Sequence, residues 1–154
     1  LWNLLPEGPR ALVLPGDELG PDQRRDLDVR PVGRFVHEPD GAVIRAGLLD
    51  AIKPARDLWL LDPHIAYLSS DEPLNSPFAT TFEVLEELPY DAKRVRAWVR
   101  EHAVGTLEIK KRGIDVDPAA LRRQLKPKGP NAATLILART VDGTRALVCR
   151  RLAD

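Results

Sequence analysis

The amino-acid sequence predicts an α/β (α+β) fold, a small mixed sheet with packed helices, and three observations support it. Apolar Leu107 and Ile109 alternate with polar neighbours, which is typical of a strand. Asp91 and Asp117 each precede an amphipathic stretch, as helix N-caps do. Residues 132–138 are apolar on both faces, which favours an interior strand.

Residues 1–36 are interrupted by Pro and Gly, and only a short apolar run stands out among them, at 11–14. We expect a buried strand there, a hairpin partner ending at residues 1–2, and an extended piece over 32–36. None of these segments makes a core by itself, so we interpret them as peripheral strands of a sheet whose other members are absent. Such orphan strands are expected to pair with another copy, giving a dimer, or to wrap the body of the domain.

The middle of the chain predicts a helix followed by strands. Asp40 is a candidate N-cap for a helix through Ile52, and Pro54 closes that helix. Strands are expected over 57–61, 64–68 and 78–87, with a polar loop over 69–77. The acidic residues of the last strand, which we expect to form a solvated edge, are Glu83, Glu86 and Glu87.

From residue 89 the order helix, strand, helix, strand, strand predicts a compact α/β unit. The first helix runs from Asp91 to about Glu101. Its inward-facing residues are expected to be Ala92, Val95, Trp98, Val99 and His102. The stretch 104–113 is expected to be a buried central strand that delivers a basic loop to a short helix at 117–125. A tight turn at 141–144 precedes the return strand, 145–150.

The composition, 44% hydrophobic and 30% charged residues, is that of a soluble globular protein. No apolar run approaches the roughly 18 residues of a membrane span, and no signal-peptide pattern opens the chain, so a cytoplasmic location is expected. The single Cys149 excludes an internal disulfide. Because the chain starts at Leu1 and contains no methionine, we expect it to be an excerpt of a longer protein.

Motifs for catalysis are missing from the sequence, which has no G-x-G-x-x-G loop, Walker loop, G-x-S-x-G elbow or C-x-x-C pair. The three histidines stand far apart without ligand spacing, so no metal site is expected. His37 and Glu38 have no third catalytic partner, and helix capping explains them better. A deep pocket around His37, Glu38 and Asp40 would support an autonomous enzyme. Without one, no catalytic residue and no cofactor is assigned to this excerpt.

Charge is strongly segregated along the chain. Residues 1–90 carry 8 basic against 16 acidic side chains, and residues 91–154 carry 15 basic against 7 acidic ones. A cationic half indicates an anionic partner. The alternative is an ordinary charged surface whose two halves attract one another.

The cations of the second half form the candidate phosphate-binding set, which we expect to converge on one surface. Arginine predominates in the chain, 17 against 6 lysines, and its planar guanidinium suits phosphate recognition. Aromatic residues are scarce in this half, so recognition of folded RNA through shape and backbone fits better than base stacking. The candidate residues are Lys110, Lys111, Arg112, Arg122, Arg123, Lys126, Lys128, Arg94 and Arg100.

Several strings in the sequence resemble the C-terminal part of a bacterial family of class I S-adenosylmethionine-dependent methyltransferases that ends in a THUMP-like domain. They are EPDGAVIRAGL at 38–48, IAYL at 65–68, SPFA at 76–79, GTLEIKKRG at 105–113 and ATLIL at 133–137. The resemblance implies an RNA-binding module that presents substrate RNA, such as tRNA, to a methyltransferase domain. S-adenosylmethionine would then be the cofactor of the parent protein.

The resemblance also suggests a division of the chain. Residues 1–36 would be the last strands of a truncated methyltransferase domain, 37–88 a connecting α/β region and 89–154 the THUMP-like domain. The alternative function is a protein-interaction module that docks on the parent catalytic domain and binds no nucleic acid.

Overall fold

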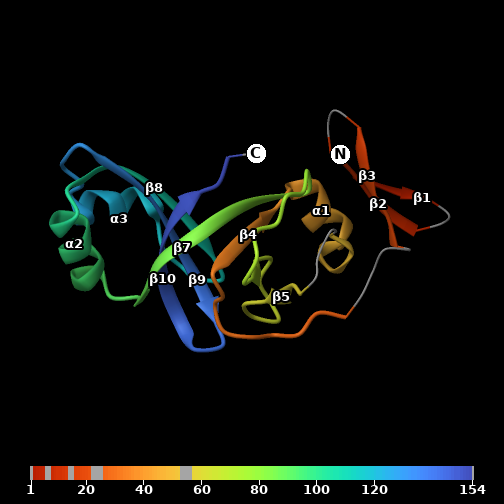
Figure 1. Ribbon diagram of the computed structural model, residues 1–154, viewed down its shortest axis with the longest axis horizontal. Coiled ribbons are helices and arrows are strands. Elements are labelled where there is room, and N and C mark those ends of the chain that lie inside the picture. Colours follow the sequence, from red (N-terminus) through yellow and green to blue (C-terminus); the bar gives the residue numbers. More distant parts are fainter. Residues whose placement is uncertain (1, 6–7, 14–15, 22–25, 53–56, 154) are drawn as a thin grey trace.

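A computed structural model describes residues 2–5, 8–13, 16–21, 26–52 and 57–153. Its main feature is a seven-stranded mixed sheet in the order β5-β6-β4-β7-β10-β9-β8 (Figure 1). The strands of this sheet are β4 (Phe35–Pro39), β5 (Trp59–Leu60), β6 (Leu68–Ser70), β7 (Ala79–Pro89), β8 (Val104–Arg112), β9 (Asn131–Thr140) and β10 (Gly143–Arg151). Helices α2 (Ala92–Glu101) and α3 (Pro118–Leu125) cover one face, called here the helical face.

The predicted order of elements in the C-terminal half is confirmed. Asp91 caps α2 by accepting hydrogen bonds from the backbone N–H groups of Lys93 and Arg94. Asp117 caps α3 in the same way, with Pro118 at the first helical position. The helix α3 connects the parallel strands β8 and β9, and a tight turn connects the antiparallel β9 and β10.

The strand β8 is an edge strand, so the prediction of a central strand is wrong. It pairs with β9 on one side, and α3 reaches over its free edge. There the Arg122 guanidinium donates to the Leu107 carbonyl from Nε at 3.2 Å and from Nη2 at 2.9 Å. This side chain occupies an acceptor that an added strand would need, which protects the edge.

Apolar side chains fill both faces of the sheet. On the helical face, Val95 and Val99 of α2 and Leu121 of α3 pack against β8, β9 and β10. On the opposite face, Tyr67 and other residues that precede β7 pack against β9 and β10. The buried residues of this second core are Val36, Leu61, Ile65, Tyr67, Phe82, Ile136, Ala138, Leu147 and Cys149. The connecting region and the C-terminal unit are therefore one packed body.

The predicted helix 40–52 is shorter than expected. Asp40 does cap a helix, but α1 (Gly41–Ala46) ends at Gly47, which has a φ of 66°. A left-handed residue is a common helix terminator, and glycine adopts it without strain. A short 3₁₀ turn, η2 (Leu49–Ala51), follows. Pro54, the expected terminator, lies outside the described residues.

Two predictions for the middle strands are wrong. Residues 64–68 do not form a strand, because the chain turns between Asp62 and Tyr67, and β6 uses the start of the expected 69–77 loop. The acidic residues of β7 do not lie on a sheet edge, because β7 lies between β4 and β10, although Glu86 and Glu87 are exposed to solvent as expected. Glu83 bonds Arg34 and Arg150, Glu86 accepts the Trp98 indole N–H, and Glu87 pairs with Arg145.

The N-terminal strands form a separate three-stranded antiparallel sheet, which confirms the expected hairpin. Its strands are β1 (Trp2–Leu5), β2 (Gly8–Val13) and β3 (Asp17–Leu19). Ala11 and Leu19 are buried in one core with Ala42 and Val43 of α1, so this sheet wraps onto the body of the molecule (Figure 1). None of the described helices is long and apolar enough to cross a membrane.

Candidate nucleic-acid interface

The nine predicted phosphate-binding residues fall into two groups, so the structure does not gather all of them on one surface. Six come from α2, α3 and the loop after α3, on the helical side of the sheet. The other three come from the end of β8. The six are called here the helical cations: Arg94, Arg100, Arg122, Arg123, Lys126 and Lys128.

The local sequence of α3 explains how its cations are presented. Leu121 and Leu125, four residues apart, are buried against the sheet, which leaves Arg122 and Arg123 on the exposed side. Arg122 is fixed to the Leu107 carbonyl, whereas Arg123 has no ion pair within the described part of the chain. Helix α3 ends at Lys126, which adopts a left-handed conformation with a φ of 50°.

The loop after α3 is held tightly against the end of α2. A Cβ atom on Gly129 would lie 2.1 Å from the Ala103 carbonyl oxygen, and one on Gly105 would lie 1.9 Å from the Gly129 carbonyl oxygen. The side chain of Asn131 donates to the His102 carbonyl at 2.8 Å. These contacts place the exposed Lys126 and Lys128 beside the C-terminal end of α2.

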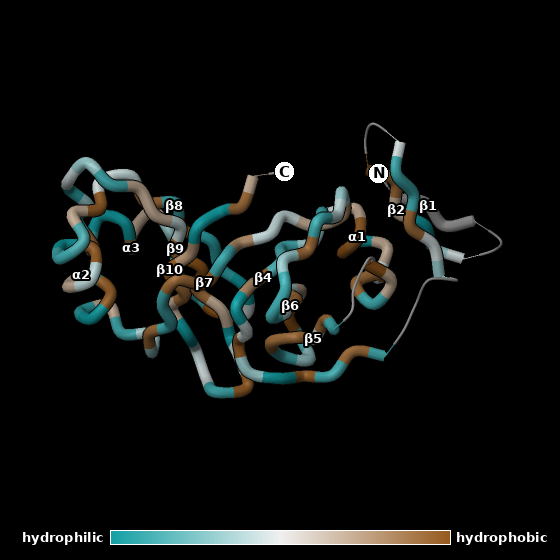
Figure 2. Tube along the Cα trace, viewed as in Figure 1, coloured by the Kyte–Doolittle hydropathy of each residue, from teal (hydrophilic) through white to brown (hydrophobic). Residues whose placement is uncertain are grey.

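Helix α2 also presents cations to solvent. Figure 2 shows hydrophilic and hydrophobic residues alternating around this helix. Val95 and Val99 face the core, while Arg94 and Arg100 are exposed and form no ion pair with any described carboxylate. The inward positions predicted for Trp98 and His102 are wrong in part, since Trp98 is half-buried and His102 is exposed.

At the end of β8, alternation along the strand separates Lys110 and Arg112 from Lys111. Lys110 and Arg112 project from the face opposite the helices. There Lys110 Nζ lies 3.1 Å from Glu38 Oε1, and the Arg112 guanidinium lies 5.5 Å from the centroid of the Tyr67 ring. Lys111 is exposed and has no ion pair among the described residues. Glu38 thus already neutralises one of the three strand-end cations.

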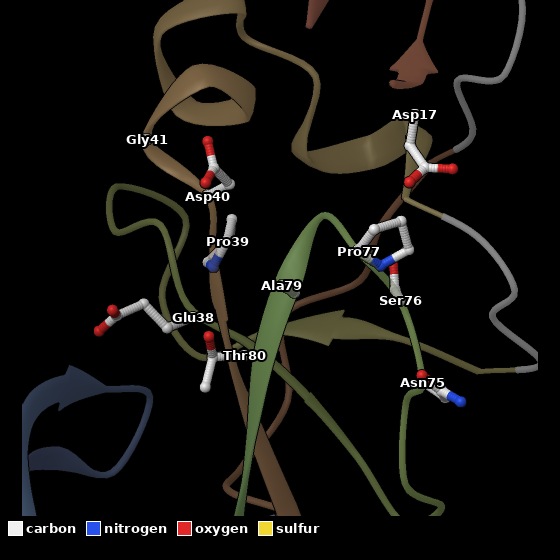
Figure 3. A pocket seen from close by; sticks show the side chains of 10 residues that line it. All are labelled: Asp17, Glu38, Pro39, Asp40, Gly41, Asn75, Ser76, Pro77, Ala79 and Thr80. Carbon is white, nitrogen blue, oxygen red and sulfur yellow. The ribbon is translucent and has the colours of Figure 1, made fainter. Parts of the chain in front are cut away.

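A polar cavity of about 650 Å³ lies next to this cluster (Figure 3). Glu38 and Thr80 come from the neighbouring strands β4 and β7, while Asp17 comes from the N-terminal sheet. The Ser76 hydroxyl oxygen accepts a hydrogen bond from the backbone N–H of Phe78. The lining residues are Asp17, Glu38, Pro39, Asp40, Gly41, Asn75, Ser76, Pro77, Ala79 and Thr80.

His37 does not line this cavity, although a pocket around it would have supported an enzyme. Its ring is fully buried between the hydroxyls of Thr81 and Ser70, at 2.9 and 2.7 Å. Burial lowers the pKa of His37 to about 4, so the ring is neutral near pH 7. Within the described residues no cluster of His, Cys, Asp and Glu could hold a metal ion. Cys149 is buried, and burial raises the pKa of its thiol to about 12, so it is no reactive nucleophile.

Comparison with known proteins identifies relatives of this chain. A family model described as THUMP domain-like matches residues 79–151. The chain is 41% identical, over 146 residues, to an uncharacterized S-adenosylmethionine-dependent methyltransferase found in two strains of Mycobacterium tuberculosis. The match covers 92% of this chain and 40% of the relative, so the chain spans two-fifths of the relative's length.

The fold also occurs in a solved structure. The crystal structure of a "putative methyltransferase" from Porphyromonas gingivalis superimposes with a TM-score of 0.69 at 22% sequence identity. The superposition covers 90% of this chain and 35% of that protein. At this level of identity the similarity shows a common fold.

Proposed function

Since residues 79–151 form a THUMP-like domain, in a chain homologous to the C-terminal two-fifths of S-adenosylmethionine-dependent methyltransferases, we propose that this chain binds RNA and presents it to a methyltransferase domain. The substrate RNA, of which tRNA is one candidate, would be held by the THUMP-like domain. The methyl transfer would take place on the part of the longer protein that this chain does not include. A cytoplasmic location fits this role.

The observation that carries the proposal is the set of helical cations without acidic partners. Arg94, Arg100 and Arg123, together with two lysines of the following loop, are exposed and form no ion pair with any described carboxylate. By contrast, Arg34, Arg139 and Arg150 elsewhere on the molecule are each paired with an acidic residue. Unpaired cations on adjacent elements are free to replace the counterions of a phosphate backbone.

The parent protein supplies the rest of the proposed activity. The sequence has no glycine-rich cofactor loop, so S-adenosylmethionine would bind to the preceding methyltransferase domain. We further propose that residues 1–36, which include the sheet β1-β2-β3, are the last strands of that domain. Their packing on α1 would then connect the catalytic domain to the RNA-binding part.

The test is the affinity of the full chain for tRNA at about 0.1 M salt, where the Debye length is about 10 Å, measured by filter binding. The test variant combines Arg123→Gln, Lys126→Asn and Lys128→Gln. Asparagine is chosen at residue 126 because it tolerates the left-handed backbone there. Loss of three phosphate contacts is expected to weaken binding at least tenfold.

The matched control removes three arginines that are not among the helical cations, through Arg45→Gln, Arg150→Gln and Arg151→Gln. Its affinity for tRNA is expected to stay within about threefold of the unmodified chain, since long-range charge effects are largely screened. Equal losses in both variants would mean that net charge, rather than this surface, governs binding. If the chain binds no tRNA but retains the parent's catalytic domain in a pull-down, it is a docking module instead.

A further inference from the structure

Two aromatic rings form a stacked pair on the surface at the end of α2. The ring centroids of Trp98 and His102 are 4.1 Å apart, and their planes differ by 16°. The indole packs against the core of the helical face, and its N–H donates to Glu86. His102 is exposed, so the outer side of its ring faces solvent while the inner side rests on the indole.

Backbone contacts hold the imidazole ring in this position. His102 Nδ1 lies 2.9 Å from the Trp98 carbonyl oxygen, within hydrogen-bonding distance. The His102 carbonyl accepts a hydrogen bond from the Asn131 side chain, and the Ala103 carbonyl accepts one from the Asn131 backbone N–H at 3.1 Å. A flat, oriented ring is therefore present before any ligand arrives, which limits the entropy lost on binding.

The same contacts bring the loop after α3, which carries Lys126 and Lys128, next to the two rings. Gly129 lies against Ala103, the residue after His102, and Lys128 directly precedes Gly129. Lys126, at the end of α3, is exposed on the same loop. A stacking surface beside cations is the arrangement with which proteins bind unpaired nucleotides, because the base stacks while the phosphate is neutralised.

We infer that Trp98 and His102 form a stacking platform for an unpaired nucleobase of the RNA, while Lys126 and Lys128 bind the flanking phosphates. This inference rests on the proposed function and specifies its ligand as a single-stranded nucleotide next to a folded region. The base is uncharged, so it tolerates the neighbouring carboxylates of Glu86 and Glu101. The platform thus adds base contact to a surface that otherwise recognises only phosphates.

The experiment compares two RNA probes of equal charge on the full chain by fluorescence anisotropy. One is a hexamer of unpaired adenosines, and the other is the same hexamer with abasic sugars. The unmodified chain is expected to bind the adenosine hexamer about tenfold more tightly. His102→Ala is expected to remove this difference without changing the affinity for the abasic probe. The matched control is His64→Ala, which removes another exposed histidine, far from α2 in the sequence.

Quenching of the tryptophan fluorescence of the unmodified chain provides a second readout. Adenosine stacked on the platform is expected to quench part of the emission of the unmodified chain, and Trp98→Phe is expected to remove that part. If both probes bind equally well, or if His102→Ala weakens both alike, the platform is wrong while phosphate binding stands. If neither probe binds while tRNA does, the platform is wrong and the proposed function stands; if tRNA does not bind either, both fail.

Discussion

At the scale of single residues, two glycines control the position of the loop after α3, which carries Lys126 and Lys128. Gly105 and Gly129 allow two backbone segments to approach more closely than any side chain permits, and Gly129 has a φ of 145°. A positive φ of this size is accessible almost only to glycine. The location of Lys126 and Lys128 beside α2 therefore depends on two residues that carry no functional group.

Gly105→Ala is expected to lower the free energy of unfolding by at least about 2 kcal/mol, because the new Cβ would overlap the Gly129 carbonyl. Chemical denaturation of both proteins measures the change. Gly16→Ala is the matched control, since nothing lies within 4 Å of a Cβ at Gly16, and it should shift stability by no more than about 0.5 kcal/mol. A Gly105 variant as stable as the control would contradict the close approach of the two segments.

His37 gives a pH-dependent prediction at the same scale. Its pKa is lowered to about 4 in the folded protein, while an unfolded histidine has a pKa of about 6.5. Between these values the unfolded chain binds more protons than the folded one, so the stabilising contribution is complete above about pH 6.5 and is lost as the pH falls. The expected loss from this residue is about 3 kcal/mol between pH 7 and pH 4.

The measurement is the free energy of unfolding across this pH range for the unmodified chain and for His37→Gln. Glutamine can keep hydrogen bonds to the Ser70 and Thr81 hydroxyls but does not titrate. The variant is expected to have a flatter slope between pH 4 and pH 6.5. Parallel curves would show that the histidine is not buried in its neutral form.

At the scale of elements, the ends of the helices follow from local chemistry. The aspartate caps of α2 and α3 and the hairpin between β9 and β10 are short-range signals, and all three could be predicted from the sequence. The sequence places the end of α1 too far along the chain, because Pro54, seven residues after Gly47, is the stronger terminator signal. An isolated glycine in a helical pattern is ambiguous, since it is tolerated there at a modest cost.

Gly47 therefore offers a test of how α1 ends. Gly47→Ala is expected to cost about 1 kcal/mol, since alanine is strained at a φ of 66° although space is open around the residue. Gly47→Asn should cost less than the alanine variant, because asparagine tolerates the left-handed conformation. Thermal unfolding of the three proteins measures the order. An alanine variant as stable as the unmodified chain would mean that α1 continues past Gly47.

The sheet order could not be predicted in the same way. The alternation of apolar and polar residues along β8 correctly places Leu107 and Ile109 on one face of the sheet and their polar neighbours on the other. It does not reveal which elements cover either face. Lys110 meets Glu38 across 72 positions of sequence, and nothing local to either residue indicates the pairing. The candidate interface is consequently predicted as one surface, whereas Lys110 and Arg112 project on the side of the sheet opposite the helical cations.

At the scale of the whole molecule, the family match and the packed body have different boundaries. The THUMP-like match starts at residue 79, yet the core opposite the helices also contains Val36, Leu61 and Tyr67. The strand β4 pairs with β7 along five residue pairs. The division at residues 88 and 89 that the sequence suggests would also separate parts of one sheet.

A fragment of residues 79–151 is therefore expected to unfold or aggregate, because it would expose the second core and the edge of β7. A fragment of residues 26–153 keeps both cores of the sheet and is expected to give a cooperative unfolding transition. Calorimetry and size-exclusion chromatography of the two fragments measure this difference. A monomeric shorter fragment with a sharp transition would contradict the larger folding unit.

The charge asymmetry acquires a physical meaning at this scale. Many acidic residues of the first half form ion pairs with nearby arginines, as Asp57 and Asp28 do with Arg30. Asp62 bonds Arg139 of the second half, and this pairing lowers the pKa of the Asp62 carboxyl. The helical cations remain outside these pairs. What distinguishes the helical surface, rather than net charge, is that several unpaired cations come from adjacent elements, α2, α3 and the loop after α3.

The most direct test of this account is the salt dependence of tRNA binding. For the unmodified chain, the logarithm of the association constant is expected to fall steeply and linearly with the logarithm of salt concentration. The combined variant of Arg123→Gln, Lys126→Asn and Lys128→Gln is expected to have a slope shallower by about two to three, roughly one for each lost phosphate contact. Parallel lines for the two proteins would contradict the assignment of the helical cations to phosphate binding.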